Sequence, residues 1–308
     1  MRFLSSSCNA LARGATVYLS RSTCIFENLA FEEWLFRNHD LAAKGEALLV
    51  WSNRPTIVIG RHQNPWIEAN LPYLQEHGIA LVRRHSGGGT VYHDLDNVNF
   101  SFLTEHARHC RPRNLRLIAA ALNKEFGFNL TPTKRDDILL QPNDRKVSGT
   151  AARIARNRAY HHLTLLVNVD LRTLSASLRS SYLDKIETNA TRSTVAARVG
   201  YLRQDRKDID KDRVVETVVR AFSEQFEAVE SRIVENVLDQ HRFPGVVETY
   251  DELRGWQWLF GHTPKFTASL PSGVSVTVEK GIITSVEGAA VESKSLLGQR
   301  FCQKMLAV

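Results

Sequence analysis

Three consecutive glycines, Gly87, Gly88 and Gly89, constrain the fold more than any other feature of this 308-residue chain. Residues without a Cβ atom can adopt positive φ, so the N–H groups of such a segment can converge on one ligand. Arg83 and Arg84 precede the glycines, and a β-branched and aromatic run follows them. The pattern predicts an anion-binding loop for phosphate or carboxylate between two strands. An ordinary glycine-rich connection between strands is the alternative.

The glycines do not belong to either of two common phosphate-binding motifs. The chain contains no G-x-G-x-x-G, which would indicate a dinucleotide site, and no G-x-x-x-x-G-K-[ST], which would indicate a Walker loop. If the loop binds phosphate, it does so in a different structural setting.

The composition is that of a globular protein with one large and one smaller domain. Hydrophobic residues make up 43% of the chain and charged residues 24%, and no apolar run is long enough to cross a bilayer. The net charge of +7 indicates an acidic partner. Because the lysines and arginines are scattered and do not alternate with aromatic residues, we expect no nucleic-acid binding.

The cysteines and the N-terminus bear on the cellular compartment. Cys8, Cys24, Cys110 and Cys302 have no short spacing, so neither a disulfide framework nor a zinc site is expected, and we predict no bound metal. The residues before Glu27 contain three arginines, five serines and no acid. This composition predicts a mitochondrial transit peptide over residues 1–25, and an N-terminus without a targeting role is the alternative.

Periodicity predicts the secondary structure. Apolar residues at helical spacing predict helices over residues 26–39, 71–77, 114–126, 171–178 and 208–229, and a further helix over 249–258, with Asn114 as an N-cap. Short apolar or alternating runs predict strands over 47–51, 56–60, 79–84, 90–93, 98–104, 138–140 and 160–169. Residues 180–200 lack a period and are expected to form a loop that becomes ordered on a ligand.

The end of the chain predicts a separate small unit. Phe243, Pro244 and Gly245 mark a boundary, and the runs 265–270, 274–279 and 282–287 suggest a small sheet with a turn at Lys280 and Gly281. A mixed α/β domain with a small C-terminal α+β appendage fits this order of elements.

Lys146 is the leading candidate for chemistry. It precedes Ser148 and Gly149, and a lysine beside such a turn can present its charge to a developing oxyanion or a phosphate. A solvated surface lysine is the alternative. The sequence gives little support to a nucleophilic mechanism, because no cysteine lies between Arg111 and Phe301 and no G-x-S-x-G occurs. His161 and His162 alternate on a strand, which disfavours a shared metal.

Several motifs, in this order, resemble the lipoate-protein ligase A family. They are residues 83–94 (RRHSGGGTVYHD), 146–151 (KVSGTA) and 161–166 (HHLTLL). Within the family, residues 60–66 (GRHQNPW) and the Thr90-Val91-Tyr92 form of the loop resemble the mitochondrial lipoyltransferase branch. The resemblance extends from about residue 26 to about residue 265.

The resemblance implies an α/β (α+β) fold. We expect a biotin/lipoate-ligase-like catalytic domain with mixed sheets and packed helices over residues 26–242. A small C-terminal α+β accessory domain is expected over 243–308, preceded by the transit peptide over 1–25. The accessory domain is short, which raises the question of whether the protein activates free lipoate with ATP itself.

The resemblance also implies a site for lipoyl-AMP, a mixed anhydride of lipoate and AMP. Lys146 is expected to be catalytic and to contact the lipoyl carbonyl and the α-phosphate together. Thr191 and Ser193 belong to a segment resembling the adenylate-binding loop. The implied lipoyl-nucleotide-binding residues are Arg84, Gly87, Gly88, Gly89, Thr90, Val91, Tyr92, Arg135, Asp137, Lys146, Thr164, Thr191 and Ser193.

The implied activity is transfer of the lipoyl group from lipoyl-AMP, or another activated or protein-bound donor, to a lysine of a lipoyl domain. The expected acceptors are acyltransferase subunits of 2-oxoacid dehydrogenases and the glycine-cleavage H protein, in the mitochondrial matrix, with the enzyme acting as a monomer away from membranes. One alternative is a complete ATP-dependent lipoate-protein ligase, which would also need Mg²⁺. Another is a non-catalytic module that binds a lipoyl-nucleotide or a lipoyl-protein.

Overall fold

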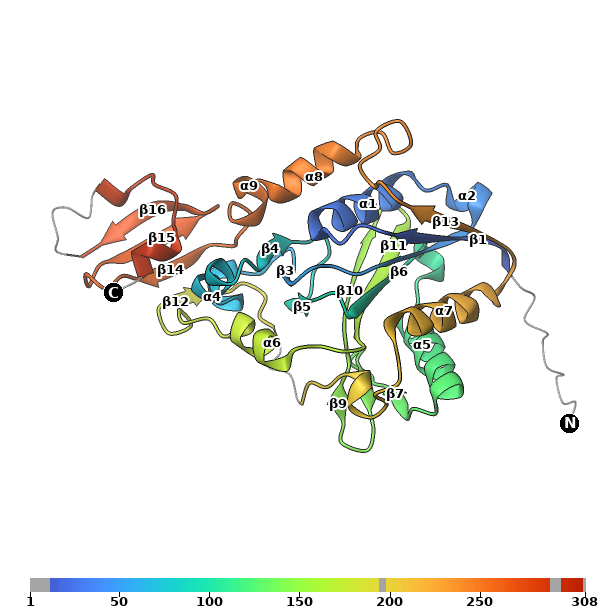
Figure 1. The fold of residues 1–308 in the computed structure, drawn as a ribbon. Helices are drawn as coiled ribbons and strands as arrows, with labels where there is room; N and C mark the ends of the chain where they lie inside the picture. Colours follow the sequence, from blue (N-terminus) through green and yellow to red (C-terminus); the bar gives the residue numbers. More distant parts are fainter. Residues whose placement is uncertain (1–11, 194–197, 289–294, 307–308) are drawn as a thin grey trace, which may run out of the picture.

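A six-stranded mixed sheet forms the centre of the protein (Figure 1), whose computed structural model describes residues 12–193, 198–288 and 295–306. Strand β1 is parallel to both of its neighbours, whereas the remaining pairs in the sheet are antiparallel. The strand order is β10 (Ser148–Ala155), β11 (Arg158–Leu166), β6 (Asn97–Glu105), β2 (Glu46–Trp51), β1 (Ala12–Ser20) and β13 (Phe226–Val234).

Helices cover both faces of this sheet because alternate residues of each strand point to opposite sides. In β2, Leu48 and Val50 pack with apolar residues of α5 (Arg111–Phe126) and α7 (Lys211–Ser223). Ala47 and Leu49 instead join the cluster formed with α1 (Ile25–Asn38) and α8 (Val246–Arg254). All four of these β2 side chains are at most 4% exposed, so the sheet is buried on both faces.

Two small sheets lie beside the central one. The first has the order β4 (Ala80–Arg83), β3 (Thr56–Ile59) and β5 (Val91–His93), so the three glycines form the connection from β4 to β5. The second contains β7 (Leu130–Pro132), β8 (Ile138–Leu140) and β9 (Arg145–Lys146). Short helices occupy several connections: α2 (Leu41–Lys44) lies before β2 of the central sheet, and α3 (Pro65–Glu68), α4 (Leu71–Glu76) and α6 (Leu171–Leu178) follow β3, α3 and β11 along the chain.

The C-terminal sheet includes one strand from earlier in the chain. It contains β14 (Phe266–Ser269), β15 (Ser275–Glu279) and β16 (Ile282–Glu287), but the neighbour of β14 is β12 (Ile186–Thr188). Helix α8 packs on α1, and α9 (Trp256–Leu259) follows α8 (Figure 1). Apolar side chains of this sheet, such as Phe266, pack in one cluster with Ile57 of β3 and Trp66 of α3. Throughout the described part of the chain, every helix is too short or too polar to span a bilayer.

Two expectations about the ends of the catalytic region differ from the structure. The predicted leader over residues 1–25 overlaps β1, which lies between β2 and β13 inside the sheet, so removal of all 25 residues would remove an interior strand. The predicted helix over 208–229 is wrong beyond Ser223, where α7 ends, and β13 begins at Phe226. The β-branched residues Val229, Ile233 and Val234 favour this strand.

The local structure confirms two further predictions, on α6 and on the turn at Lys280, and shows that one on Asn114 is wrong. Helix α6 has the predicted bounds, and Lys280 and Gly281 adopt positive φ of 50° and 74° in the predicted turn between β15 and β16. Asn114 is not the N-cap of α5. That helix begins at Arg111, and the buried Asn114 side chain lies 3.1 Å from Nδ1 of His161.

Candidate functional site

A cavity of about 870 Å³ opens beside the glycine loop, which we define as residues 84–90. Its walls come from the end of that loop, the start of β10, helices α3 and α6, and the described residues on either side of 194–197. A volume of a few hundred to about 1,000 Å³ is typical of small-molecule sites. The cavity is therefore large enough to hold a nucleotide together with an acyl chain.

Lys146 presents its side chain to this cavity from β9. Its Nζ lies 2.6 Å from Oδ1 of Asp137. The backbone is held on both sides, because the Lys146 N–H donates to the Arg198 carbonyl at 2.8 Å and its carbonyl accepts from the Gly200 N–H at 2.9 Å. Lys146 is thus a positioned cation with one carboxylate partner, suited to stabilising negative charge on a ligand.

Arg84 organises the glycine loop from behind the cavity wall. Its guanidinium donates to the carbonyls of Gly87 at 2.6 Å and Gly89 at 2.7 Å, to Oγ of Ser86 at 2.8 Å, and to the Val58 carbonyl at 3.1 Å. Burial lowers the pKa of Arg84 to about 10, so the side chain remains charged at neutral pH. The arginine therefore fixes the conformation of the loop and does not itself line the large cavity.

A turn after β3 supports the same loop through a close approach that only glycine permits. A Cβ atom on Gly60 would lie 2.1 Å from the Gly88 carbonyl oxygen. Gly88 itself has φ of 83°, a conformation that disfavours a side chain. By contrast, a Cβ atom on Gly87 would meet nothing within 4 Å. The three glycines thus differ in their structural constraints.

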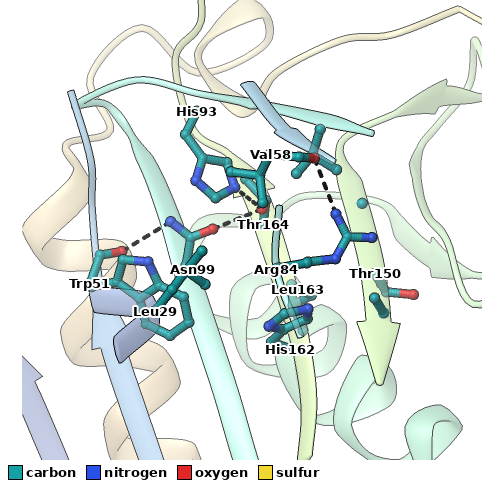
Figure 2. Close-up of a pocket in the computed structure, with 13 residues that line it drawn as sticks. Leu29, Trp51, Val58, Arg84, His93, Asn99, Thr150, His162, Leu163 and Thr164 are labelled. Atoms are coloured by element: carbon teal, nitrogen blue, oxygen red, sulfur yellow. Dashed lines mark hydrogen bonds between the residues drawn. The ribbon is translucent and has the colours of Figure 1, made fainter. Parts of the chain in front are cut away.

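Behind the wall, a chain of buried hydrogen bonds surrounds a second cavity of about 20 Å³ (Figure 2). Nε2 of His93 lies 2.8 Å from Oγ1 of Thr164, which donates to Oδ1 of Asn99 at 2.7 Å. Nδ2 of Asn53 lies 2.9 Å from Nδ1 of His93. Burial lowers the pKa of His93 to about 3, so the ring is neutral, accepting at Nδ1 and donating at Nε2. Thr164 lines both cavities.

Ser86, His162 and Glu32 form a hydrogen-bonded row that resembles a hydrolase triad only in its chemistry. Nε2 of His162 lies 2.9 Å from Oγ of Ser86, and Nδ1 lies 2.9 Å from Oε1 of Glu32. Ser86 is 1% exposed and also accepts a hydrogen bond from Arg84. A nucleophile must reach its substrate, so this row anchors the glycine loop and does not attack a ligand.

Glu68, at the end of α3, joins two loops at the cavity wall. Its Oε1 accepts hydrogen bonds from Nε of Arg192 at 3.0 Å and from the Ser193 N–H at 3.2 Å, and Oγ1 of Thr90 lies 3.2 Å from Oε2. Ser193 in turn accepts a hydrogen bond from the Thr90 N–H at 2.8 Å through its Oγ. Arg192 and Ser193 are thereby linked to the end of the glycine loop.

Another part of the cavity wall is apolar. Leu171, Leu174 and Leu178 of α6 line the cavity, together with Tyr92 and Leu166. The three leucines of α6 are half-buried, which leaves apolar surface facing the cavity. One side of the cavity is therefore suited to charged or polar groups and the other to an acyl chain.

The structure brings together about half of the residues that the sequence singled out. Those lining the large cavity are Thr90, Val91, Tyr92, Lys146, Thr164 and Ser193. Asp137 contacts Lys146, whereas Arg84, Gly87, Gly88 and Gly89 are not among the residues that line the large cavity. The exposed side chains of Arg135 and Thr191 do not contribute to the cavity lining.

Sequence reasoning missed Glu68, the leucines of α6 and Arg198 as parts of the site. Glu68 follows the quoted motif at residues 60–66 by two positions, so extending that motif was the available signal. The leucines carried a helical period but no sign of a ligand. Within the described ranges, no three His, Cys, Asp or Glu side chains lie together as a set of metal ligands.

Comparison with known proteins shows which family and which relatives the chain resembles. Residues 24–223 match the model of the lipoyl protein ligase A/B catalytic domain. The chain is 42% identical over 253 residues to a Mus musculus protein described as "Lipoyl amidotransferase LIPT1, mitochondrial". That match covers 80% of this chain and 66% of the mouse protein's length.

A bacterial relative and a solved structure agree with this. The chain is 39% identical over 254 residues to a lipoate-protein ligase A of Bdellovibrio bacteriovorus, covering 82% of this chain and 73% of that protein. The crystal structure of P. falciparum LipL1 in complex with lipoate superposes with a TM-score of 0.68 at 24% identity, covering 88% of this chain and 83% of that chain. The structural likeness supports the fold.

Proposed function

The chain belongs to the lipoyl protein ligase A/B family, and from this premise we propose that it transfers a lipoyl group from lipoyl-AMP to a lysine of an acceptor protein. The mouse relative that is described as a mitochondrial lipoyl amidotransferase supports the transfer reaction. The observation that carries the proposal is Lys146, held beside Asp137 on the wall of a cavity of about 870 Å³.

In the proposed reaction, the acceptor lysine attacks the carbonyl carbon of the mixed anhydride. A C–N bond forms, the C–O bond to the phosphate breaks, AMP leaves, and the amine releases one proton. Lys146 hydrogen-bonds to the carbonyl oxygen and to a phosphate oxygen, so it stabilises charge on both sides of the breaking bond. Because the donor is already activated, no covalent enzyme intermediate is required.

The remaining residues bind the donor and hold Lys146 in place. Asp137 positions Nζ of Lys146 through the contact of 2.6 Å. Thr90 and Ser193, fastened together through Glu68, are proposed to line the nucleotide end. The leucines of α6 are proposed to pack against the lipoyl arm, which excludes water from the anhydride.

The acceptors that we propose are lipoyl domains of 2-oxoacid dehydrogenase acyltransferase subunits and the glycine-cleavage H protein. A mitochondrial location is supported by the description of the mouse relative and by the arginines and serines near the N-terminus. Since β1 begins at Ala12, we propose that any leader ends before that strand.

A complete ATP-dependent ligase is the second candidate, favoured by the 39% identity to a lipoate-protein ligase A. The test is the intact mass of an apo lipoyl domain after incubation with lipoyl-AMP, and separately with lipoate, ATP and Mg²⁺. Modification with lipoyl-AMP alone supports the transferase, and modification in both mixtures supports the ligase. An acceptor that stays unmodified in both would contradict the proposed function. A lipoyl domain with arginine in place of the target lysine is the control.

A further inference from the structure

Two arginines at the large cavity have no anionic partner. Arg179 follows α6 and Arg198 follows residue 197, and both are exposed and contribute to the cavity lining. Within residues 12–193, 198–288 and 295–306, neither guanidinium has a hydrogen-bond or ion-pair partner. Arg192, a third arginine in the same lining, is instead bound to Glu68 at 3.0 Å. The cavity thus has two positive charges available for an external group.

Hydrogen bonds hold the segments from which these two arginine side chains extend. The Arg198 carbonyl accepts the Lys146 N–H at 2.8 Å, so Arg198 lies directly beside the proposed catalytic lysine. Ser180, next to Arg179, is buried and donates through Oγ to the Trp66 carbonyl at 2.5 Å. Each arginine side chain therefore extends from a backbone segment that is anchored by a hydrogen bond.

Leu183 adds an exposed apolar side chain to the same cavity. It is 47% exposed and is one of five large apolar side chains with such exposure among the described residues. Its neighbour Tyr182 is buried at 5% exposure, in the apolar cluster of the C-terminal sheet. An exposed leucine together with free arginines is typical of a protein interface, where the core is apolar and arginine is enriched.

We propose that Arg179, Leu183 and Arg198 form a docking rim that binds an acidic surface around the acceptor's target lysine. This inference rests on the proposed function, because it assigns acceptor recognition to the mouth of the same site. A nucleotide phosphate would satisfy the arginines but would make no use of the exposed leucine. A protein surface satisfies both, and the net charge of +7 favours an acidic partner.

The experiment measures acceptor binding apart from chemistry. The probe is an apo lipoyl domain whose target lysine is replaced by arginine, titrated calorimetrically into the full-length enzyme. We expect Arg179→Ala combined with Arg198→Ala to raise the Kd of the probe about tenfold, and Leu183→Ala to raise it less. Arg116→Ala, at an exposed arginine on α5, is the matched control and should leave this Kd unchanged. In the double arginine variant and in Leu183→Ala, the Kd of lipoyl-AMP should change less than the Kd of the probe.

A charge exchange sharpens the test. Arg179→Glu should weaken the probe's binding, and a glutamate-to-lysine change beside the target position of the probe should restore it. Weakened lipoyl-AMP binding with an unchanged probe Kd would assign the arginines to the nucleotide and overturn the proposal, as would a wild-type enzyme that does not bind the probe. A wild-type enzyme that binds the probe but does not lipoylate the native domain would overturn the proposed function and leave the docking rim intact.

Discussion

The two walls of the cavity are built on different principles. The wall formed by Thr90, at the end of the glycine loop, and by Glu68 is a network of partly buried polar groups held by hydrogen bonds. The wall formed by α6 presents half-buried leucines, and Ser177 is the buried residue of that helix. Buried polar networks are costly to disturb, whereas apolar contacts tolerate small changes of shape. We infer that the first wall positions the reacting group and the second accommodates the acyl arm.

The largest expected effect is at Lys146, on the polar side. Lys146→Ala should lower the rate of transfer from lipoyl-AMP by about 10²–10³-fold, because the stabilisation of the leaving phosphate is lost. The fold should remain intact, since the side chain is 29% exposed. Single-turnover rates and thermal unfolding measure the two effects, with Lys124→Ala on α5 as the control. A Lys146→Ala enzyme with a normal rate would contradict the assigned role.

A pair of glycine substitutions tests how rigid the glycine loop is. Gly60→Ala should destabilise the protein by about 1–3 kcal/mol and weaken lipoyl-AMP binding, because its Cβ would lie 2.1 Å from the Gly88 carbonyl. Gly87→Ala should be close to neutral, because its Cβ would meet nothing within 4 Å. Urea unfolding and ligand titration of the two variants provide the comparison, and equal effects would show that the loop is not tightly packed.

The network behind the polar wall predicts a dependence of stability on pH. Burial lowers the pKa of His93 to about 3 in the folded protein, below its ordinary value, so the unfolded chain takes up a proton first as the pH falls. The neutral ring therefore contributes its full stabilisation when the pH is above the ordinary pKa of histidine. This stabilisation is lost as the pH falls from that pKa towards 3. Within this window, the free energy of unfolding should depend less steeply on pH in His93→Gln than in the wild type. The expected difference in slope is about 1.4 kcal/mol per pH unit.

The measurement for His93 is urea unfolding of the wild type and the variant at a series of pH values between 7.5 and 4. The exposed His241 provides the control, since His241→Gln should leave the slope unchanged. Parallel curves for the wild type and His93→Gln would show that the buried ring is not the source of the acid lability.

The smallest expected effect is on the apolar wall. Leu174→Ala removes part of a half-buried side chain facing the cavity, so we expect lipoyl-AMP binding to weaken by about 1 kcal/mol and the transfer rate at saturation to be unchanged. The affinity for AMP alone should not change, and calorimetric titration of both ligands checks this. Weakening of AMP binding would place the nucleotide, and not the acyl arm, against α6.

The sequence predicted those helices, strands and turns that depend on the residue pattern of a short segment. The strands on either side of the glycines, helix α6 and the turn at Lys280 and Gly281 follow from periodicity and turn chemistry. Strand β1 was not predicted, because it is defined by pairing with β2 and with β13, about two hundred residues away along the chain. Its acid-free composition resembled that of a leader.

The site residues also divide into those that a local motif identified and those that only contacts in the folded chain identify. Lys146 and the segment from Thr90 to Tyr92 were identified from their motifs, and both line the cavity. The orientation of Arg84 could not be read from sequence, since only the folded loop shows its guanidinium turned towards the carbonyls of Gly87 and Gly89. Glu68 acquires its partners only when residues 191–193 fold against α3, so no local pattern identified it.

A crystal structure with a non-hydrolysable analogue of lipoyl-AMP tests the assigned roles of Lys146 and α6 most directly. We predict that the analogue occupies the large cavity, with Nζ of Lys146 within hydrogen-bond distance of both the carbonyl and the phosphate oxygens and the acyl arm against α6. An analogue bound elsewhere, or one whose anhydride group lies out of reach of Lys146, would contradict the role of Lys146 in transfer.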